Sequence, residues 1–169
     1  KVLGDLSGSA TAAIEVALLA LDGLASLASP ETISIVEVRT HAERAEIRAK
    51  ALAVLTELKK EEAVPRLEEA LSDESPLVRQ AAAKQLGELG ARASVPALVR
   101  AVNDPEVRFE ATLALARIAD PAALDVYLDA VTDKSPEIRE AARQTLVTLR
   151  ERIAEAVLAR AARGELTHR

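Results

Sequence analysis

Residues 63–90 read AVPRLEEALSDESPLVRQAAAKQLGELG, and the chain repeats this pattern twice more toward its C-terminus. Residues 93–119, ASVPALVRAVNDPEVRFEATLALARIA, match it with a loop that is two residues shorter. Residues 122–149, AALDVYLDAVTDKSPEIREAARQTLVTL, match it again. Self-similarity at a period of about 30 residues is the signature of a repeat protein, whose units bury their apolar faces against one another.

The same register extends toward the N-terminus. Shifting back by 31 residues puts Ile33, Ile47, Leu55 and Leu58 on Val64, Val78, Leu86 and Leu89. A second shift puts Val16, Ala20, Leu24 and Leu27 on Val78, Ala82, Leu86 and Leu89. We therefore expect four repeats that are preceded by half a repeat.

Each repeat is expected to contain two short amphipathic helices, and steps of Ser or Asp followed by Pro mark where helices start. Ser and Asp are good N-cap residues, and proline fits the first helical position because its missing N–H would be unpaired there. These steps are Ser29-Pro30, Ser75-Pro76, Asp104-Pro105, Asp120-Pro121 and Ser135-Pro136. Gly87, Gly90 and Gly164 are expected at helix ends or tight contacts. Residues 32–64 contain neither Pro nor Gly, so the first repeat is expected as one bent or continuous helix or as a pair.

The composition agrees with a helical repeat and excludes several classes of partner. The chain has 169 residues, with one Phe, one Tyr and no Trp, so Ala, Leu, Val and Ile must fill the core. Its 22 basic and 27 acidic residues give a net charge of −5, which is the wrong sign for a nucleic-acid partner. No stretch approaches the roughly 18 apolar residues that membrane insertion needs. The absence of Cys removes disulfides and thiolate sites.

The pattern Asp73, Pro76, Val78, Arg79, Ala82, Leu86, Gly87 resembles the HEAT-repeat family, in particular the short bacterial PBS-lyase HEAT-like repeats. The resemblance covers residues 10–150 and implies an all-α fold. That fold is an α-solenoid, a right-handed superhelix of about four helical hairpins plus an N-terminal half repeat. Family members look like protein-binding surfaces in which the second helix of each pair lines the concave face.

The ends of the chain are expected to differ from the repeat domain. Residues 1–9 are interpreted as a linker or a truncated helix, and residues 151–169 as a C-terminal capping helix with a frayed tail. Since the chain contains no Met, we expect it to be a piece of a longer protein. A cytoplasmic location is the expectation for such a domain.

No residue pattern predicts a catalytic, cofactor or metal site. The Asp73/Arg79, Asp104/Arg108 and Asp133/Arg139 pairs recur once per repeat, so we interpret them as a structural ladder that caps backbone groups and bridges helix pairs. His41 and His168 are far apart in sequence. The iron-dependent hydroxylases that modify deoxyhypusine resemble this architecture but carry several His-Glu pairs, and no His is followed by Glu here.

The predicted function is a non-enzymatic scaffold that binds a peptide or protein partner on the concave face. Residues four apart on each second helix are expected to point into this face. The predicted row is Gln80, Lys84, Glu106, Phe109, Leu113, Arg117, Glu140 and Gln144. Phe109 is either an exposed binding residue or turned inward to fill the gap left by the shorter loop. Tyr127 aligns with Leu67 and Leu98, so we expect it in the core.

Three alternatives remain from the resemblance. The chain is a regulatory HEAT-like domain of a larger enzyme, a bilin-lyase-like repeat protein that handles a tetrapyrrole, or a HEAT-like alkylpurine DNA glycosylase. The last needs a basic, aromatic groove, which this acidic chain with one Phe does not offer.

Overall fold

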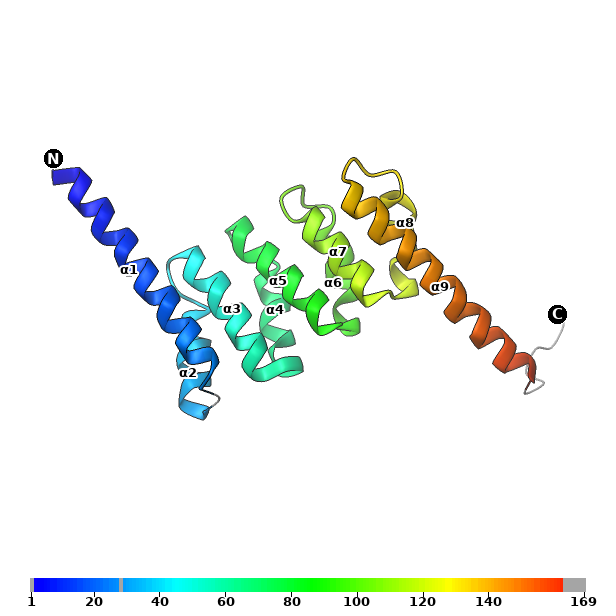
Figure 1. Ribbon diagram of the computed structural model, residues 1–169, viewed down its shortest axis with the longest axis horizontal. Coiled ribbons are helices and arrows are strands. Elements are labelled where there is room, and N and C mark those ends of the chain that lie inside the picture. The colour runs from blue at the N-terminus through cyan, green and yellow to red at the C-terminus, as the bar shows by residue number, and fades with distance from the viewer. Residues whose placement is uncertain (1, 28, 163–169) are drawn as a thin grey trace.

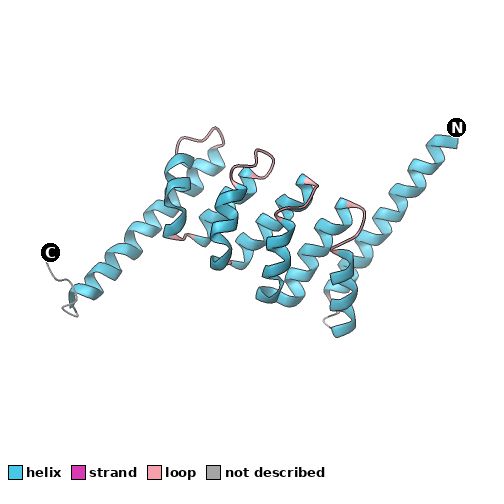
Figure 2. Cartoon of the chain, turned by 180° about the vertical axis from the view of Figure 1, so that it is seen from behind, coloured by secondary structure: helices cyan, strands magenta, loops and turns pink. Residues whose placement is uncertain are grey.

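The computed structural model describes the backbone of residues 2–27 and 29–162 and the side chains of residues 11–27, 29–152 and 154. In this part of the chain all regular structure is helical (Figure 2). The α-helices are α1 (Val2–Ala25), α2 (Pro30–Arg39), α3 (Ala45–Lys59), α4 (Val64–Ala70), α5 (Pro76–Leu89), α6 (Val95–Ala101), α7 (Arg108–Ile118), α8 (Leu124–Ala130) and α9 (Pro136–Ala162). Short 3-10 turns, η1 (Lys60–Ala63), η2 (Arg92–Ser94) and η3 (Pro121–Ala123), lead into α4, α6 and α8. No helix in the described part is long and apolar enough to cross a membrane.

The helices stack as pairs into an elongated array of two layers. The pairs are α2–α3, α4–α5, α6–α7 and α8–α9, and α1 precedes them as an unpaired second helix. Helices α1, α3, α5, α7 and α9 lie side by side in one layer, and the first helices of the pairs form the other (Figure 1). The predicted all-α solenoid with four repeats and a half repeat is therefore confirmed. We call the outer surface of α3, α5, α7 and α9 the second-helix face.

A core of aliphatic side chains runs between the layers, and one aromatic residue belongs to it. Leu52, Leu67, Leu86 and Leu98 are fully buried. Tyr127 is fully buried as well, and its hydroxyl donates to the Leu115 carbonyl at 2.8 Å. Burial raises the pKa of Tyr127 to about 12, because the charged phenolate is poorly solvated there. The prediction of Tyr127 as a core residue is confirmed.

Most predicted helix starts are confirmed, and two differ. α2, α5 and α9 begin at the proline of their Ser-Pro step, and the Ser29 hydroxyl accepts from Thr32 N–H at 3.2 Å. α7 begins only at Arg108, because the shorter loop after Asp104 forms a turn first. Pro121 begins the 3-10 turn η3 and not an α-helix.

The first repeat is a clean helix pair, α2 and α3, so of the two alternatives that the sequence left open the bent or continuous helix is wrong. The backbone turns between Thr40 and Arg44 without Pro or Gly. Arg48 donates to the carbonyls of Ala42 and Glu43 at 2.9 and 2.8 Å, and Arg66 donates to the Thr40 carbonyl at 2.7 Å. These long side chains satisfy the loop carbonyls that a continuous helix would have paired internally.

Two of the predicted glycine positions have the expected roles. Gly87 lies inside α5, where an added Cβ would sit 2.6 Å from Cα of Ala114 in α7. Gly90 caps α5 with φ of +65°, a conformation that glycine adopts at little cost. Gly164 lies outside the described residues.

The half repeat shows how burial depends on a helix partner. α1 begins at Val2, so the residues expected as a linker or a truncated helix are helical. Leu21, which packs in the core, is 2% exposed, whereas Val16 and Leu27 are 66% and 59% exposed. Val78, the register equivalent of Val16, is fully buried. In α5, the first helix of the pair covers Val78. In the described part of the chain, α1 has no such first helix.

Candidate functional site

The residues of the predicted partner-binding row lie in one layer but do not form one continuous site. Their elements are α5 for Gln80 and Lys84, the following loop for Glu106, α7 for Phe109, Leu113 and Arg117, and α9 for Glu140 and Gln144. Each of the eight is half-buried or exposed. The structure joins three of them in a cavity, engages two in a contact between repeats and leaves the other three apart.

Lys84, Leu113 and Arg117 meet around a shallow cavity of about 190 Å³ between α5 and α7. Glu110 completes its lining. The wall thus offers one aliphatic side chain between two cationic groups and one carboxylate. Sequence reasoning missed Glu110, although the spacing of residues 110, 113 and 117 along a helix would have identified it.

Gln80 and Glu106 are engaged with each other. The Gln80 side-chain amide donates to the Glu106 backbone carbonyl at 2.5 Å. This hydrogen bond ties α5 to the loop of the next repeat. The amide of Gln80 therefore serves contact between repeats, and its predicted role toward a partner has no direct support in this geometry.

Phe109 packs toward the neighbouring repeat. The ring is half-buried and packs against a small apolar cluster of Ala130, Ile138 and Ala142 from the last helix pair. The shorter loop starts α7 at Arg108, directly before this ring. The part of the ring that remains accessible keeps its role toward a partner as a prediction.

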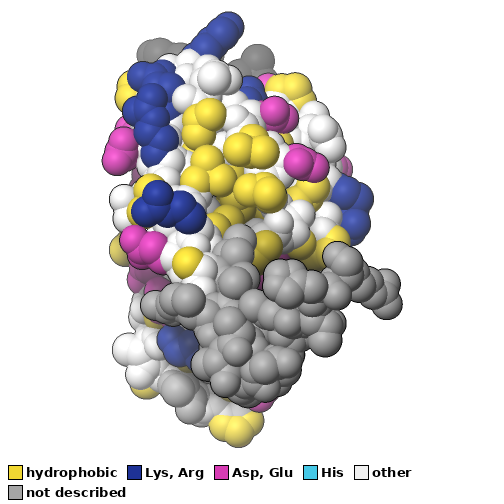
Figure 3. Space-filling model, turned by 90° about the vertical axis from the view of Figure 1, so that its right-hand side faces the viewer, with side chains coloured by type: hydrophobic (Ala, Val, Ile, Leu, Met, Phe, Trp, Pro, Cys, Tyr) yellow, Lys and Arg dark blue, Asp and Glu magenta, His cyan; other side chains and the backbone are white. Residues whose placement is uncertain are grey.

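Glu140 and Gln144 are exposed on α9, away from the α5–α7 cavity. The same end of the array carries a different kind of surface. Figure 3 looks onto this end and shows hydrophobic side chains that gather into a patch. The large exposed apolar residues of the last pair are Leu124, Leu128 and Val147, 42%, 51% and 45% exposed.

A larger groove of about 380 Å³ lies on the other side of α5, between α3 and α5. Thr56, Lys60, Gln85 and Leu89 line it together with Lys84. Since Lys84 also lines the α5–α7 cavity, it stands on the ridge between two neighbouring depressions. Sequence reasoning missed this groove, because its lining comes from the flanks of two helices.

The Asp/Arg ladder is structural, and each arginine reaches forward to the next repeat. The rungs are Arg48 to Asp73 at 2.7 and 2.9 Å, Arg79 to Asp104 at 2.8 Å and Arg108 to Asp133 at 2.6 Å. Arg79 also donates to the Asp73 carbonyl at 2.8 Å, and Arg139 donates to the Asp133 carbonyl at 2.8 Å. The predicted capping and bridging roles therefore agree with the geometry. The arginine of each rung binds the aspartate of the following repeat, whereas the pairs expected from the sequence join it to the aspartate just before it.

The buried rung also shows in the pKa of Asp73. Burial alone would raise this pKa, but hydrogen bonds from the Arg48 guanidinium and from Ser75 N–H outweigh it and hold the pKa below its usual value. Such a carboxylate stays charged and paired, and it is not poised to exchange protons with a substrate.

A metal site finds no support among the described side chains. No three His, Asp or Glu side chains within this part of the chain gather closely enough to hold an ion. His41 is exposed at the end of α2, and His168 lies outside the described residues.

Comparison with known proteins adds two findings. The model of HEAT repeats matches residues 34–106 and 100–166, without specifying the PBS-lyase subclass. A structure of human deoxyhypusine hydroxylase in complex with glycerol is similar, with a TM-score of 0.52 and 23% sequence identity. The match covers 92% of this chain and 49% of that chain, so the chain spans about half the length of the hydroxylase structure. Similarity at this level concerns the fold alone. No curated protein sequence matches the chain.

Proposed function

The chain belongs to the HEAT-repeat family, and on this premise we propose that it is a non-enzymatic scaffold that binds a peptide or protein partner on its second-helix face. Stacked repeats offer extended surfaces of this kind. The observation that carries the proposal is the meeting of Lys84, Leu113 and Arg117 at the α5–α7 cavity. An apolar side chain among polar and charged groups suits the mixed chemistry of a protein interface.

The charges on this face support a protein partner over a polyanion. Lys84 lies 3.9 Å from Glu88, and Lys50 pairs with Asp22 on α1. Glu110 borders the cavity next to Arg117. Cationic groups that are interleaved with carboxylates do not give the clustered positive charge that phosphate binding needs.

The chemistry of the chain supports a scaffold rather than a catalyst. The similarity to deoxyhypusine hydroxylase is one of fold, and the His-Glu pairs that the resemblance implies for such hydroxylases do not occur in this sequence. The recurrent Asp/Arg pairs, which are the strongest candidates for acid–base groups, connect repeats instead.

Selection from a phage-displayed library of random short peptides tests the proposal. We expect the chain to enrich peptides that bind the second-helix face. Leu113→Glu should weaken their binding by about tenfold or more, because a carboxylate would replace the apolar wall of the cavity. Dissociation constants from fluorescence polarisation of the enriched peptides measure this effect.

Leu128→Glu is the matched control, because Leu128 is an exposed leucine on α8 in the other layer. Its peptide affinity should equal that of the unmodified chain. Peptides that lose binding with Leu128→Glu but keep it with Leu113→Glu would contradict the proposal and move the site to the end patch. A chain that enriches no peptide would contradict it as well.

A further inference from the structure

The joint between α3 and α5 differs from the next joint at one pair of equivalent positions. Between α5 and α7, Gly87 packs so closely on Ala114 that no Cβ would fit. One repeat earlier in the same register, Thr56 stands at the Gly87 position and Gln85 at the Ala114 position. The α3–α5 joint therefore holds two large polar side chains where the α5–α7 joint holds the two smallest residues.

This exchange of size coincides with the groove between α3 and α5. Thr56 and Gln85 both line it, and both residues are largely buried, with 5% and 8% exposed. Side chains of this size cannot approach as closely as Gly87 and Ala114 do. The groove has about 380 Å³, twice the roughly 190 Å³ of the α5–α7 cavity.

The Gln85 amide is the unusual group of this groove. The Thr56 hydroxyl donates to the Leu52 carbonyl at 2.8 Å. The amide of Gln85, by contrast, makes no hydrogen bond to any described residue, although the residue is only 8% exposed. No fully enclosed side-chain polar atom in the described part of the chain lacks a hydrogen-bond partner, so the Gln85 amide still reaches the solvent of the groove. The polar groups of a bound molecule can replace that solvent.

The chemistry of the groove indicates what that molecule is. A primary amide offers a donor and an acceptor side by side, which matches the N–H and C=O of a backbone peptide unit. Helices and paired strands already use these backbone groups, so only an extended segment has them free. Lys60 and Glu57 line the groove beside the Lys84–Glu88 pair, and this balance of charge favours a neutral backbone over a phosphate or a carboxylate.

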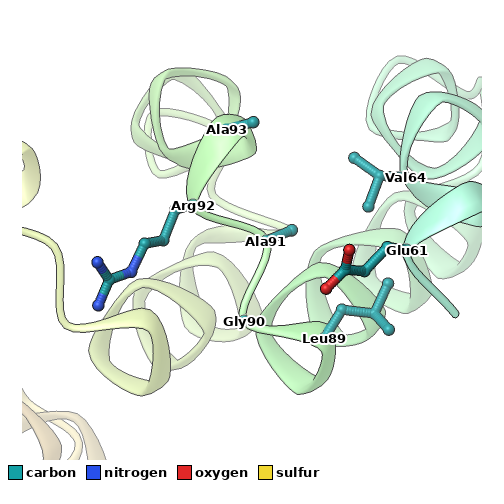
Figure 4. Close-up of a pocket in the computed structure, with 7 residues that line it drawn as sticks. All are labelled: Glu61, Val64, Leu89, Gly90, Ala91, Arg92 and Ala93. Carbon is teal, nitrogen blue, oxygen red and sulfur yellow. The ribbon is translucent and has the colours of Figure 1, made fainter.

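The groove also has an apolar wall beyond the amide. Leu89 lines both this groove and a neighbouring cavity of about 340 Å³. Figure 4 shows Leu89 and Val64 at that cavity, with the Glu61 carboxylate between them. A side chain of a bound segment that follows the amide contact would reach this apolar surface.

We propose that the α3–α5 groove holds an extended segment of the partner, whose backbone N–H and C=O pair with the Gln85 amide. This assignment rests on the proposed function, and it identifies the part of the second-helix face that forms hydrogen bonds with the partner's backbone. Lys84, on the ridge, connects the groove with the α5–α7 cavity, so one segment that crosses α5 contacts both.

Gln85→Leu tests the assignment with the peptides that the phage selection enriches. Leucine removes the amide but keeps its bulk, and Val54 and Ala114 show that apolar residues are accepted at this register position. We expect the variant to be folded and at least as stable as the unmodified chain, with peptide affinity reduced about tenfold. Asn103→Ala, which removes an exposed amide in the loop before α7, should leave the affinity unchanged.

The outcomes separate this assignment from the proposed function. Affinity that falls with Leu113→Glu but not with Gln85→Leu would overturn the assignment and leave the scaffold function standing. A chain that enriches no peptide would overturn both.

Nuclear magnetic resonance gives a direct second measurement. Labelling glutamine with nitrogen-15 gives signals from three side-chain amides, those of Gln80, Gln85 and Gln144. Saturating peptide should shift the Gln85 pair, which is identified by its loss in Gln85→Leu. A Gln85 pair that does not move would overturn the assignment.

Discussion

Gly87 sets the distance at which α5 and α7 pack, and one methyl group tests this. Gly87→Ala would put a Cβ 2.6 Å from Cα of Ala114, so the backbone of α7 would have to move. We expect the free energy of unfolding in urea to fall by about 1–3 kcal/mol. Gly23→Ala is the matched control: nothing lies within 4 Å of its Cβ, so helix propensity should stabilise α1 by about 0.5–1 kcal/mol. Equal stability of Gly87→Ala and the unmodified chain would contradict the close contact.

Tyr127 is the single tyrosine of the chain, so its ionisation can be followed by absorbance. Burial raises its pKa to about 12. Because the folded-state pKa lies above the unfolded value of about 10, the stabilisation is fully present below that value and is lost as pH rises toward the folded-state pKa. We expect the tyrosinate signal to appear with a midpoint near pH 12 in the folded chain and near 10 in concentrated urea. A midpoint near 10 without urea would contradict the burial.

Phe109 decides between a packing role and a binding role. Because its ring packs on Ala130, Ile138 and Ala142, Phe109→Ala should lower the free energy of unfolding by about 2 kcal/mol, less than full burial would give. Lys84→Glu, at an exposed position, should change it by less than about 0.5 kcal/mol. Unchanged stability of Phe109→Ala together with lost peptide binding would instead restore the binding role.

At the scale of elements, the rungs of the ladder differ in burial and should differ in strength. Arg48 and Asp73 are 8% and 12% exposed at their side chains, whereas Arg108 is 51% exposed. Asp73→Asn leaves a buried guanidinium without its counter-charge and should cost about 3 kcal/mol in urea denaturation. Asp133→Asn should cost about 1 kcal/mol or less, because water reaches Arg108. Equal losses would show that burial does not set the strength of a rung.

The Asp73 rung should also shape the response to acid. Because the folded-state pKa of Asp73 is lowered, its stabilisation is present above the unfolded value of about 4 and is lost as pH falls through the folded-state pKa. The free energy of unfolding should therefore fall below about pH 4, and less steeply in Asp73→Asn. Identical acid slopes in the two chains would assign the acid sensitivity to other carboxylates.

Element boundaries could be predicted from sequence where local chemistry decides them. Ser75-Pro76 starts a helix because cap and proline act within one turn. Asp104-Pro105 does not start a helix. In the shorter loop, the Asp104 side chain accepts from Arg79, and the Asp104 carbonyl accepts from the N–H groups of Val107 and Arg108. The turn after α2 could not be predicted either, since Arg66 stabilises it from the next repeat.

At the scale of the whole molecule, the last helix pair has the most exposed arginine of the ladder, although Thr145 and Arg152 of α9 also donate to the carbonyls of Ala116 and Ala119. Arg48 and Arg79 each bind a carboxylate and also donate to loop carbonyls. In the described part of the chain, Arg108 binds the Asp133 carboxylate but donates to no loop carbonyl. Ala130, Ile138 and Ala142 form a cluster apart from the main core.

Native-state hydrogen exchange tests this joint. The backbone amides of residues 138–148 should exchange through a local opening, with lower protection than those of α5. Tyr127, which is tied to Leu115 by its hydroxyl, sets the boundary of the region that opens. Equal protection in α5 and α9 would show that the array opens only as one unit.

The overall architecture could be predicted because the same pattern of apolar positions recurs in each repeat. The site could not be predicted in this way. The predicted row followed outward positions on single helices, and it contained Lys84, Leu113 and Arg117, which line the α5–α7 cavity. The α3–α5 groove depends on how far apart two helices lie, which Thr56 and Gln85 set only jointly. Phe109 packs partly against the last helix pair, beside a loop that is shorter than its counterparts, and a periodic pattern does not predict such a contact.

The short loop between Asp104 and Arg108 gives the array a mechanical consequence. The first three pairs are joined by one buried rung and one half-buried rung, whereas the arginine of the last rung is half exposed. A force applied to α9 would therefore act first on the contact between Arg108 and Asp133, and the last helix pair would rotate about it. The helix pairs that form the α3–α5 groove and the α5–α7 cavity would keep their shape, while Glu140 and Gln144 would move with the last helix pair.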